Sequence, residues 1–178
     1  AGFKVITTLD LTLQKKLEET VSAAIPKLER IGGDNMAAVV QDVDTAQVLA
    51  LVGSRDFNYP GYGELDVANT PRSPGSSFKP YDYATLMAQN KDFGAGSTFY
   101  DLNTDFGGVP PYKPKDYDLR EPGAMAMRAS LGGSRNTPAI KANYIAGTQN
   151  VINQAKKMGL TSGTSCEPNC GLSSAIGD

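Results

Sequence analysis

Pro74-Gly75-Ser76-Ser77-Phe78-Lys79-Pro80 is the most informative stretch of this 178-residue sequence. The Pro-Gly pair predicts a sharp turn, and the residues after it predict a helix from about Ser76 to Asn90. Within a helix, Ser76 and Lys79 are three residues apart, so their side chains share one face, one turn from each other. The stretch therefore predicts a serine and a lysine held together at the start of a helix.

A serine beside a lysine is a candidate catalytic pair. The hydroxyl is a weak nucleophile until a neighbouring base takes its proton, and the chain contains no histidine. We expect Lys79 to be that base, with a pKa lowered by burial, and the N–H groups at the helix start to favour an oxyanion. S-x-x-K also occurs by chance in many chains, so the pattern needs support from elsewhere in the sequence.

A second polar stretch, Ser134-Arg135-Asn136, lies between two predicted helices and presents Ser134 and Asn136 on one side. Taken alone, it is best explained by helix capping, because serine and asparagine are good N-cap residues and Pro138 suits a first turn. Together with Ser76 and Lys79, the same two residues become candidates for one active site.

Length and composition limit the possible functions. The chain is 40% hydrophobic and 20% charged, which suits one packed domain. Seventeen basic and nineteen acidic residues give a net charge of -2, so we expect no nucleic-acid partner. No run approaches the roughly 18 apolar residues of a membrane span, and the first residues form no signal-peptide core. Without histidine we expect no metal, and we expect no cofactor.

Periodicity predicts several helices and one hairpin. Apolar residues recur every three or four positions from 13 to 28, which predicts a helix capped by Asp10 or Thr12 and disturbed by Pro26. The runs Met36–Val43 and Gln47–Gly53 predict a hairpin. The remaining predicted segments are a loop over Ser54–Ser73, an irregular region over Lys91–Pro122, helices over Gly123–Leu131, Thr137–Ile145 and Thr148–Met158, and a loop beyond Gly159.

The two polar stretches have the order and residue types of the S-x-x-K and S-x-N motifs of serine acyltransferases. On Ser76-Ser77-Phe78-Lys79 and Ser134-Arg135-Asn136, the chain resembles the penicillin-binding protein transpeptidases of the serine β-lactamase superfamily, in their bifunctional, class A type. The resemblance covers essentially all 178 residues, including Thr7-Thr8-Leu9-Asp10, Ala37–Gly53, Asn69–Pro80 and Tyr112–Asp118.

This resemblance implies a fold and a reaction. The fold is α+β, a three-layer α/β/α serine β-lactamase or transpeptidase type, with residues 1–178 as its N-terminal portion. The reaction is D,D-transpeptidation of peptidoglycan, in which Ser76 attacks a D-Ala-D-Ala stem peptide and forms an acyl-enzyme. Lys79 takes the proton of Ser76, Ser134 relays a proton to the leaving amine, and Asn136 binds the substrate amide and Lys79. β-Lactams are expected to acylate Ser76.

The resemblance also implies a location at the extracytoplasmic face of the cell membrane, in the cell envelope, with the membrane anchor outside this chain. A serine β-lactamase or β-lactam sensor would share Ser76, Lys79 and Ser134, and a non-catalytic binding module would keep only the fold. The segments Thr7–Gln14 and Tyr112–Asp118 favour the transpeptidase. Retention of both Ser76 and Lys79 argues against the non-catalytic module.

The third motif of the family, Lys-Thr/Ser-Gly on an edge strand, is missing from the sequence. None of the eleven lysines precedes Thr-Gly or Ser-Gly, and we interpret Thr161-Ser162-Gly163-Thr164, which follows Leu160, as a loop. The chain is then either a fragment whose complementing C-terminal half is another polypeptide, or a truncated product. Half a domain exposes an unpaired sheet edge, so we expect it to associate with that half or with itself.

Two smaller departures from the family and one pair of cysteines remain. Asp116 stands where the family commonly has Asn, and Ala46 stands where its hairpin usually has Gly. Cys166 and Cys170 are close enough in sequence to form a disulfide, which suits an oxidising envelope. Two free thiols are the next alternative, and a zinc half-site comes last because the chain offers no further Cys or His ligand.

Overall fold

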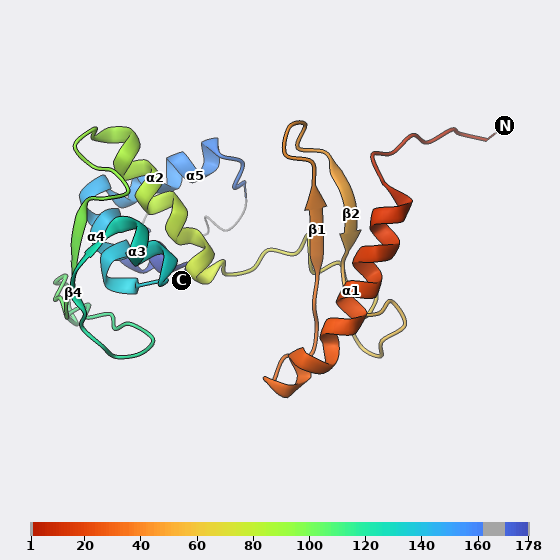
Figure 1. Ribbon diagram of the computed structural model, residues 1–178, viewed down its shortest axis with the longest axis horizontal. Helices are drawn as coiled ribbons and strands as arrows, with labels where there is room; N and C mark the ends of the chain where they lie inside the picture. Colours follow the sequence, from red (N-terminus) through yellow and green to blue (C-terminus); the bar gives the residue numbers. More distant parts are fainter. Residues whose placement is uncertain (1, 162–169, 178) are drawn as a thin grey trace. The chain divides into compact units, whose positions relative to one another are not determined.

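The computed structural model describes residues 2–161 and 170–177, and the chain forms two compact units, residues 1–70 and 71–178 (Figure 1). The first unit contains helix α1 and a hairpin. The second unit contains α2 to α5, a second hairpin and two 3-10 turns. In chain order the elements are α1 (Leu11–Arg30), β1 (Ala38–Gln41), β2 (Val48–Val52), η1 (Gly75–Phe78), α2 (Lys79–Gln89), β3 (Thr98–Asp101), β4 (Gly123–Ala126), α3 (Met127–Gly132), α4 (Asn136–Ala146), α5 (Thr148–Lys157) and η2 (Leu172–Ile176).

Helix α1 confirms the predicted N-terminal helix and its cap. Asp10 accepts hydrogen bonds from the backbone N–H groups of Thr12 and Leu13, at 2.8 and 3.0 Å. Pro26 lies inside the helix, which continues to Arg30, so the predicted disturbance does not interrupt it. Val21 and Ile25 are buried, one turn apart on one face. That face packs against β2.

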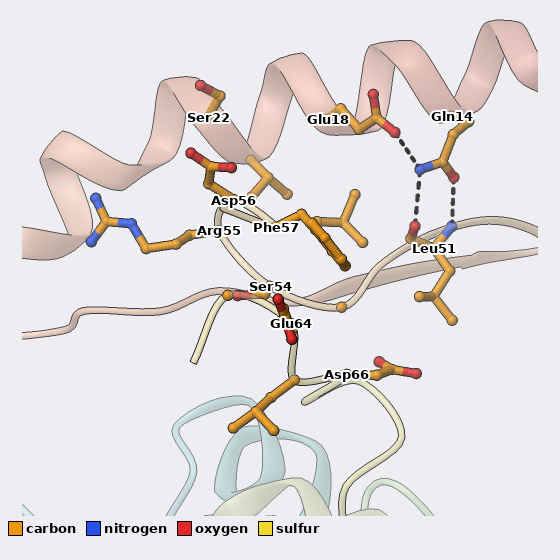
Figure 2. A pocket seen from close by; sticks show the side chains of 15 residues that line it. Gln14, Glu18, Ser22, Leu51, Ser54, Arg55, Asp56, Phe57, Glu64 and Asp66 are labelled. Carbon is orange, nitrogen blue, oxygen red and sulfur yellow. Dashed lines mark hydrogen bonds between the residues drawn. The ribbon is translucent and has the colours of Figure 1, made fainter. Parts of the chain in front are cut away.

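The predicted first hairpin is confirmed as an antiparallel pair of β1 and β2, with an irregularity between Val40 and Gln41. Its turn places Ala46 at a φ of +57°, a left-handed conformation that glycine adopts more readily. This conformation gives a physical reason for the glycine that the family resemblance led us to expect at this position. The carboxamide of Gln14 on α1 makes two 2.9 Å hydrogen bonds with the backbone of Leu51, and so ties the helix to β2 (Figure 2).

The second unit surrounds a hydrophobic core. Its buried members come from η1, α2, β3, α3, α4 and α5: Phe78, Tyr83, Leu86, Phe99, Met127, Ala139, Ala142, Ala146, Val151, Ile152 and Ala155. Phe78, Tyr83 and Leu86 are each at most 4% exposed, whereas the neighbouring Met87 is 38% exposed. The predicted helices over Thr137–Ile145 and Thr148–Met158 are confirmed as α4 and α5.

Two predictions in the second unit were wrong. Strand β3 lies within the segment Lys91–Pro122 that was expected to be irregular, and residues 123–126 form β4 instead of the start of a helix. The two strands pair antiparallel, with Thr98 opposite Ala126. Each strand has only four residues, and Ala and Met favour helix, so the pairing overrides the local preference.

The predicted helix start near Ser76 was displaced. Residues 75–78 form the 3-10 turn η1, and α2 begins only at Lys79. The reason is Pro80, which has no N–H to donate to the Ser76 carbonyl in an α-helical bond. The Lys79 N–H donates to that carbonyl instead, and the bond closes a tighter turn. In the part of the chain that is described, no helix is both long and apolar enough to cross a membrane.

Candidate active site

Ser76 lies on η1 directly after Gly75, whose φ is +53°. The side chain is exposed, as a nucleophile must be to reach a substrate. Among the described residues, no hydrogen bond joins its hydroxyl to Lys79. Catalytic hydrogen bonds are often long in the absence of substrate and tighten when substrate binds.

Lys79 is fully buried at the first position of α2, and its ammonium points into the loop before α4. Its Nζ donates to the Ser134 carbonyl at 2.5 Å, to the Ser134 hydroxyl at 3.2 Å and to Asn136 Oδ1 at 2.7 Å. Three acceptors match the three N–H bonds of an ammonium. The structure thus brings together three of the four residues that the sequence singled out.

Burial lowers the pKa of Lys79 below its ordinary value, because the charged amine loses its hydration. The carboxylates of Asp116 and Asp82 oppose this shift, and the Arg135 guanidinium adds to it. A neutral amine has two N–H bonds and one lone pair. Since the Ser134 hydroxyl can both donate and accept, its contact with Lys79 suits either protonation state of the lysine.

Ser134 and Asn136 do not cap α4, so the capping interpretation was wrong. The N-cap position is Arg135, whose side chain makes no capping bond. The cap comes from a distant loop, where Asp116 Oδ1 accepts the Asn136 backbone N–H. The Asn136 side chain instead donates from Nδ2 to the Lys115 carbonyl at 2.8 Å, and this bond turns its Oδ1 towards Lys79.

Arg135 anchors the loop from the opposite side. It is 4% exposed, it pairs with Asp101 and with Asp118 at 2.9 Å, and it donates to the Arg120 carbonyl. Burial alone would lower the pKa of Arg135, but its bonds to Asp118 and Asp101 raise the pKa above the ordinary value. The Ser134 backbone has a φ of +50°, a strained conformation that these contacts help to hold.

The acidic partners of Arg135 were missed by the sequence analysis. Asp101 and Asp116 are both buried, and burial, together with Asp116, raises the pKa of Asp101 to about 6. The available signal was the segment Tyr112–Asp118, which was noted only as a family resemblance. Nothing in the local sequence indicates that Asp101, more than thirty residues from Arg135, meets it.

Two further sequence predictions fall partly on residues that the structure does not describe. The proposed pairing of Cys166 with Cys170 and the loop Thr161–Thr164 involve residues outside the described ranges, so both stay predictions.

A separate cavity of about 650 Å³ lies within the first unit, between α1, β2 and residues 53–66 (Figure 2). It is lined by Glu18, Asp56, Glu64 and Asp66 among others, and among described residues no three potential ligands are placed to hold a metal.

Comparisons with known proteins place these observations in a family. A sequence model described as "Penicillin binding protein transpeptidase domain" matches residues 36–171. Penicillin-binding protein 1B of Vibrio cholerae is 28% identical over 164 residues, which cover 90% of this chain and 21% of that protein. The chain thus spans about a fifth of the length of this curated relative.

Two solved structures share the fold over nearly the whole chain. The penicillin-binding protein PonA1 from Mycobacterium tuberculosis aligns with a TM-score of 0.75 at 22% identity, covering 98% of this chain and 45% of that one. Penicillin-binding protein A from the same organism, solved as an imipenem acyl-enzyme complex, aligns with a TM-score of 0.71 at 16% identity, covering 97% and 47%. These matches confirm the predicted mixed α and β fold.

Proposed function

Because the chain belongs to the penicillin-binding protein transpeptidase family, we propose that it carries the nucleophile-bearing part of a D,D-transpeptidase active site. The substrate is a peptidoglycan stem peptide ending in D-Ala-D-Ala, and β-lactams are inhibitors. The acyl-enzyme formed with imipenem by penicillin-binding protein A supports the second point. The site of action is the outer face of the cytoplasmic membrane.

One observation carries this proposal, the buried Lys79 amine held between Ser134 and Asn136. A lysine without such a role is rarely fully buried, because an ammonium in an apolar interior costs several kcal/mol. Here the amine lies one turn after the exposed Ser76 and has a lowered pKa. A serine and a base with those properties form a nucleophile pair.

In the proposed reaction, Lys79 in its neutral form takes the Ser76 proton while Ser76 Oγ forms a bond to the carbonyl carbon of the penultimate D-Ala. The tetrahedral intermediate collapses by breaking the C–N bond to the last D-Ala. The proton held by Lys79 passes through the Ser134 hydroxyl to the leaving amine. Attack by the amine of a second stem peptide then breaks the ester, forms the cross-link and returns the proton to Ser76.

Asn136 has two roles in this scheme. Its Oδ1 holds the Lys79 amine in place, and its amide is fixed by the Lys115 carbonyl, so its orientation is set before substrate binds. The same amide lies at the site and contacts the substrate backbone. Fixing such a group in advance lowers the ordering cost in the transition state.

The site also needs parts that this sequence lacks. An oxyanion in the transition state requires two donors, and the Ser76 N–H supplies one. The second belongs to the third family motif, for which the sequence has no candidate. We propose that a complementing C-terminal half supplies it, since loss of one oxyanion donor costs on the order of 10² to 10³ in rate.

The experiment that tests the function is intact mass spectrometry after incubation with penicillin, with and without the downstream half of a transpeptidase domain. The expected result is a gain of one penicillin mass, mapped by proteolysis to Ser76. Ser76→Ala should abolish the adduct. Ser77→Ala is the matched control, because Ser77 is the adjacent serine and its hydroxyl is engaged with the Pro74 carbonyl at 2.6 Å.

Each outcome decides between functions. An adduct that forms on wild type and Ser77→Ala but not on Ser76→Ala supports the proposal. Rapid loss of the adduct as hydrolysed penicillin identifies a β-lactamase instead. Absence of any adduct in both preparations identifies a non-catalytic module.

A further inference from the structure

Two glycine backbones meet behind the nucleophile. Gly177, which follows η2, has a φ of +77° and packs directly on Gly75, the residue before Ser76. A Cβ added at Gly177 would lie 2.3 Å from both the nitrogen and the carbonyl oxygen of Gly75, and 2.6 Å from its Cα. Real Cβ atoms essentially never come closer than 3.0 Å. Position 177 therefore accepts only glycine as long as η1, the turn that carries Ser76 (here called the nucleophile turn), keeps its position.

The same two segments are also joined by a hydrogen bond. Ser73, just before the turn, donates its hydroxyl to the Gly177 carbonyl. The bond and the glycine contact both hold the start of the turn, at Ser73 and at Gly75. A Cβ added at Gly75 would meet nothing within 4 Å, so no packing on that side of the residue restrains its left-handed backbone.

Contacts with other helices hold the η2 segment in place. Ser174 and Ala175 are buried, and η2 packs mainly on α4, the helix that begins with Asn136. The Gly177 N–H donates to Ser174 O at 3.0 Å, which ties the last turn to this anchor. The nucleophile turn and the Asn136 helix therefore rest on one common segment.

We infer that Gly177 is a positioning residue for Ser76, and that residues 171–177 form a support that sets the distance from the Ser76 hydroxyl to Lys79. This inference rests on the proposed function for its catalytic consequence, but its structural part can be tested without activity. Neither S-x-x-K nor S-x-N includes Gly177, which lies about a hundred residues after Ser76 in the sequence.

The size of the expected loss in acylation rate follows from the short distance between the added Cβ and the Gly75 backbone. Ordinary contact with a Cβ begins at 3.4 Å, so Gly177→Ala must move one backbone by about 1 Å relative to the other. A shift of that size in a reacting group can cost on the order of 10²-fold in rate. We expect the rate constant of penicillin acylation at saturation to fall by that factor, with a smaller change in the concentration that gives half-saturation.

The control is Gly159→Ala. Gly159 also has a positive φ, +99°, but nothing lies within 4 Å of the added Cβ. Both variants therefore carry a left-handed alanine, and only Gly177→Ala adds the clash with the turn. Ser73→Ala is a milder second probe, because it removes the hydrogen bond to the Gly177 carbonyl and adds no atoms.

Two measurements separate this inference from the proposed function. The first is the acylation rate, and the second is amide hydrogen exchange in the peptide covering residues 73–78, which needs no activity. We expect faster exchange there in Gly177→Ala and, to a lesser degree, in Ser73→Ala, with Gly159→Ala like wild type. Unchanged exchange and rate in Gly177→Ala overturn the inference. If wild type is never acylated, the proposed function fails. The hydrogen-exchange comparison alone then decides whether residues 171–177 hold the turn in place.

Discussion

Replacing Asp82 with asparagine should remove a large pH dependence from the stability of the second unit. Asp82 is fully buried in α2, and Asn143 Nδ2 donates to its Oδ1 at 2.8 Å. Among the described residues, its Oδ2 has no hydrogen-bond partner. Burial raises the pKa of Asp82 to about 8, although the bond from Asn143 and the charge of Lys79 favour the ionised form. Asparagine reproduces the size of the neutral acid and cannot ionise.

The sign of the effect follows from proton binding. Because the pKa is higher in the folded chain than in the unfolded chain, the proton's contribution to stability is complete below the unfolded value of 3.8 and is lost as the pH rises through 8. Each pH unit in that interval changes the free energy of unfolding by about 1.4 kcal/mol. Between about pH 5 and pH 8, wild type should lose roughly 4 kcal/mol that Asp82→Asn keeps.

Urea unfolding at several pH values, followed by far-ultraviolet circular dichroism, measures this difference. Asp92→Asn is the control, because it removes an exposed carboxylate just beyond α2. Asp101, whose pKa is also raised, is present in all three proteins and its contribution largely cancels. Stabilities of wild type and Asp82→Asn that change in parallel with pH would refute a protonated Asp82.

Two further predictions concern Arg135 and Pro26. Arg135→Met leaves Asp101 and Asp116 buried without their cation and should lower the free energy of unfolding by about 3–5 kcal/mol, whereas the exposed Arg128→Met should change it by at most about 0.5 kcal/mol in the same urea titration. An equal loss in both would contradict the buried cluster. Pro26→Ala should stabilise the first unit by about 1–3 kcal/mol, because proline inside a helix removes a backbone hydrogen bond. An unchanged or lower melting temperature in calorimetry would contradict this expected cost of the proline.

The parts of the fold that the sequence predicted correctly are those set by local interactions. Helix α1 carries its own cap at Asp10 and its own apolar face, and the first hairpin has β-prone runs on both sides of a polar turn. Strands β3 and β4 could not be predicted in this way. Their four-residue lengths carry little periodicity, and their partners lie about 25 residues apart along the chain. Only the paired structure decides their conformation.

In the candidate site, too, some features were predictable from the sequence and others depend on tertiary contacts. The positions of Ser76 and Lys79 follow from their spacing in one turn, and the pairing of Lys79 with Ser134 and Asn136 followed from the family resemblance. The support of the site by Asp116, Arg135 and Gly177 was not predictable. A buried carboxylate that caps a helix from another segment leaves no periodic pattern, and a glycine that is required by a backbone contact looks like any loop glycine.

The structure also gives a physical reason for the spacing of the second motif. The backbone changes conformation at each residue of this motif: Ser134 is left-handed with a φ of +50°, Arg135 is extended with φ and ψ of -67° and 134°, and Asn136 begins α4. In this arrangement Ser134 and Asn136 both contact Lys79, while the Arg135 side chain pairs with the carboxylates of Asp101 and Asp118. Because Arg135 is held by its ion pairs with Asp101 and Asp118, it fixes the orientation of both neighbouring residues, Ser134 and Asn136. Arg135→Met should thus disturb acylation as well as stability, although the Arg135 side chain itself is buried.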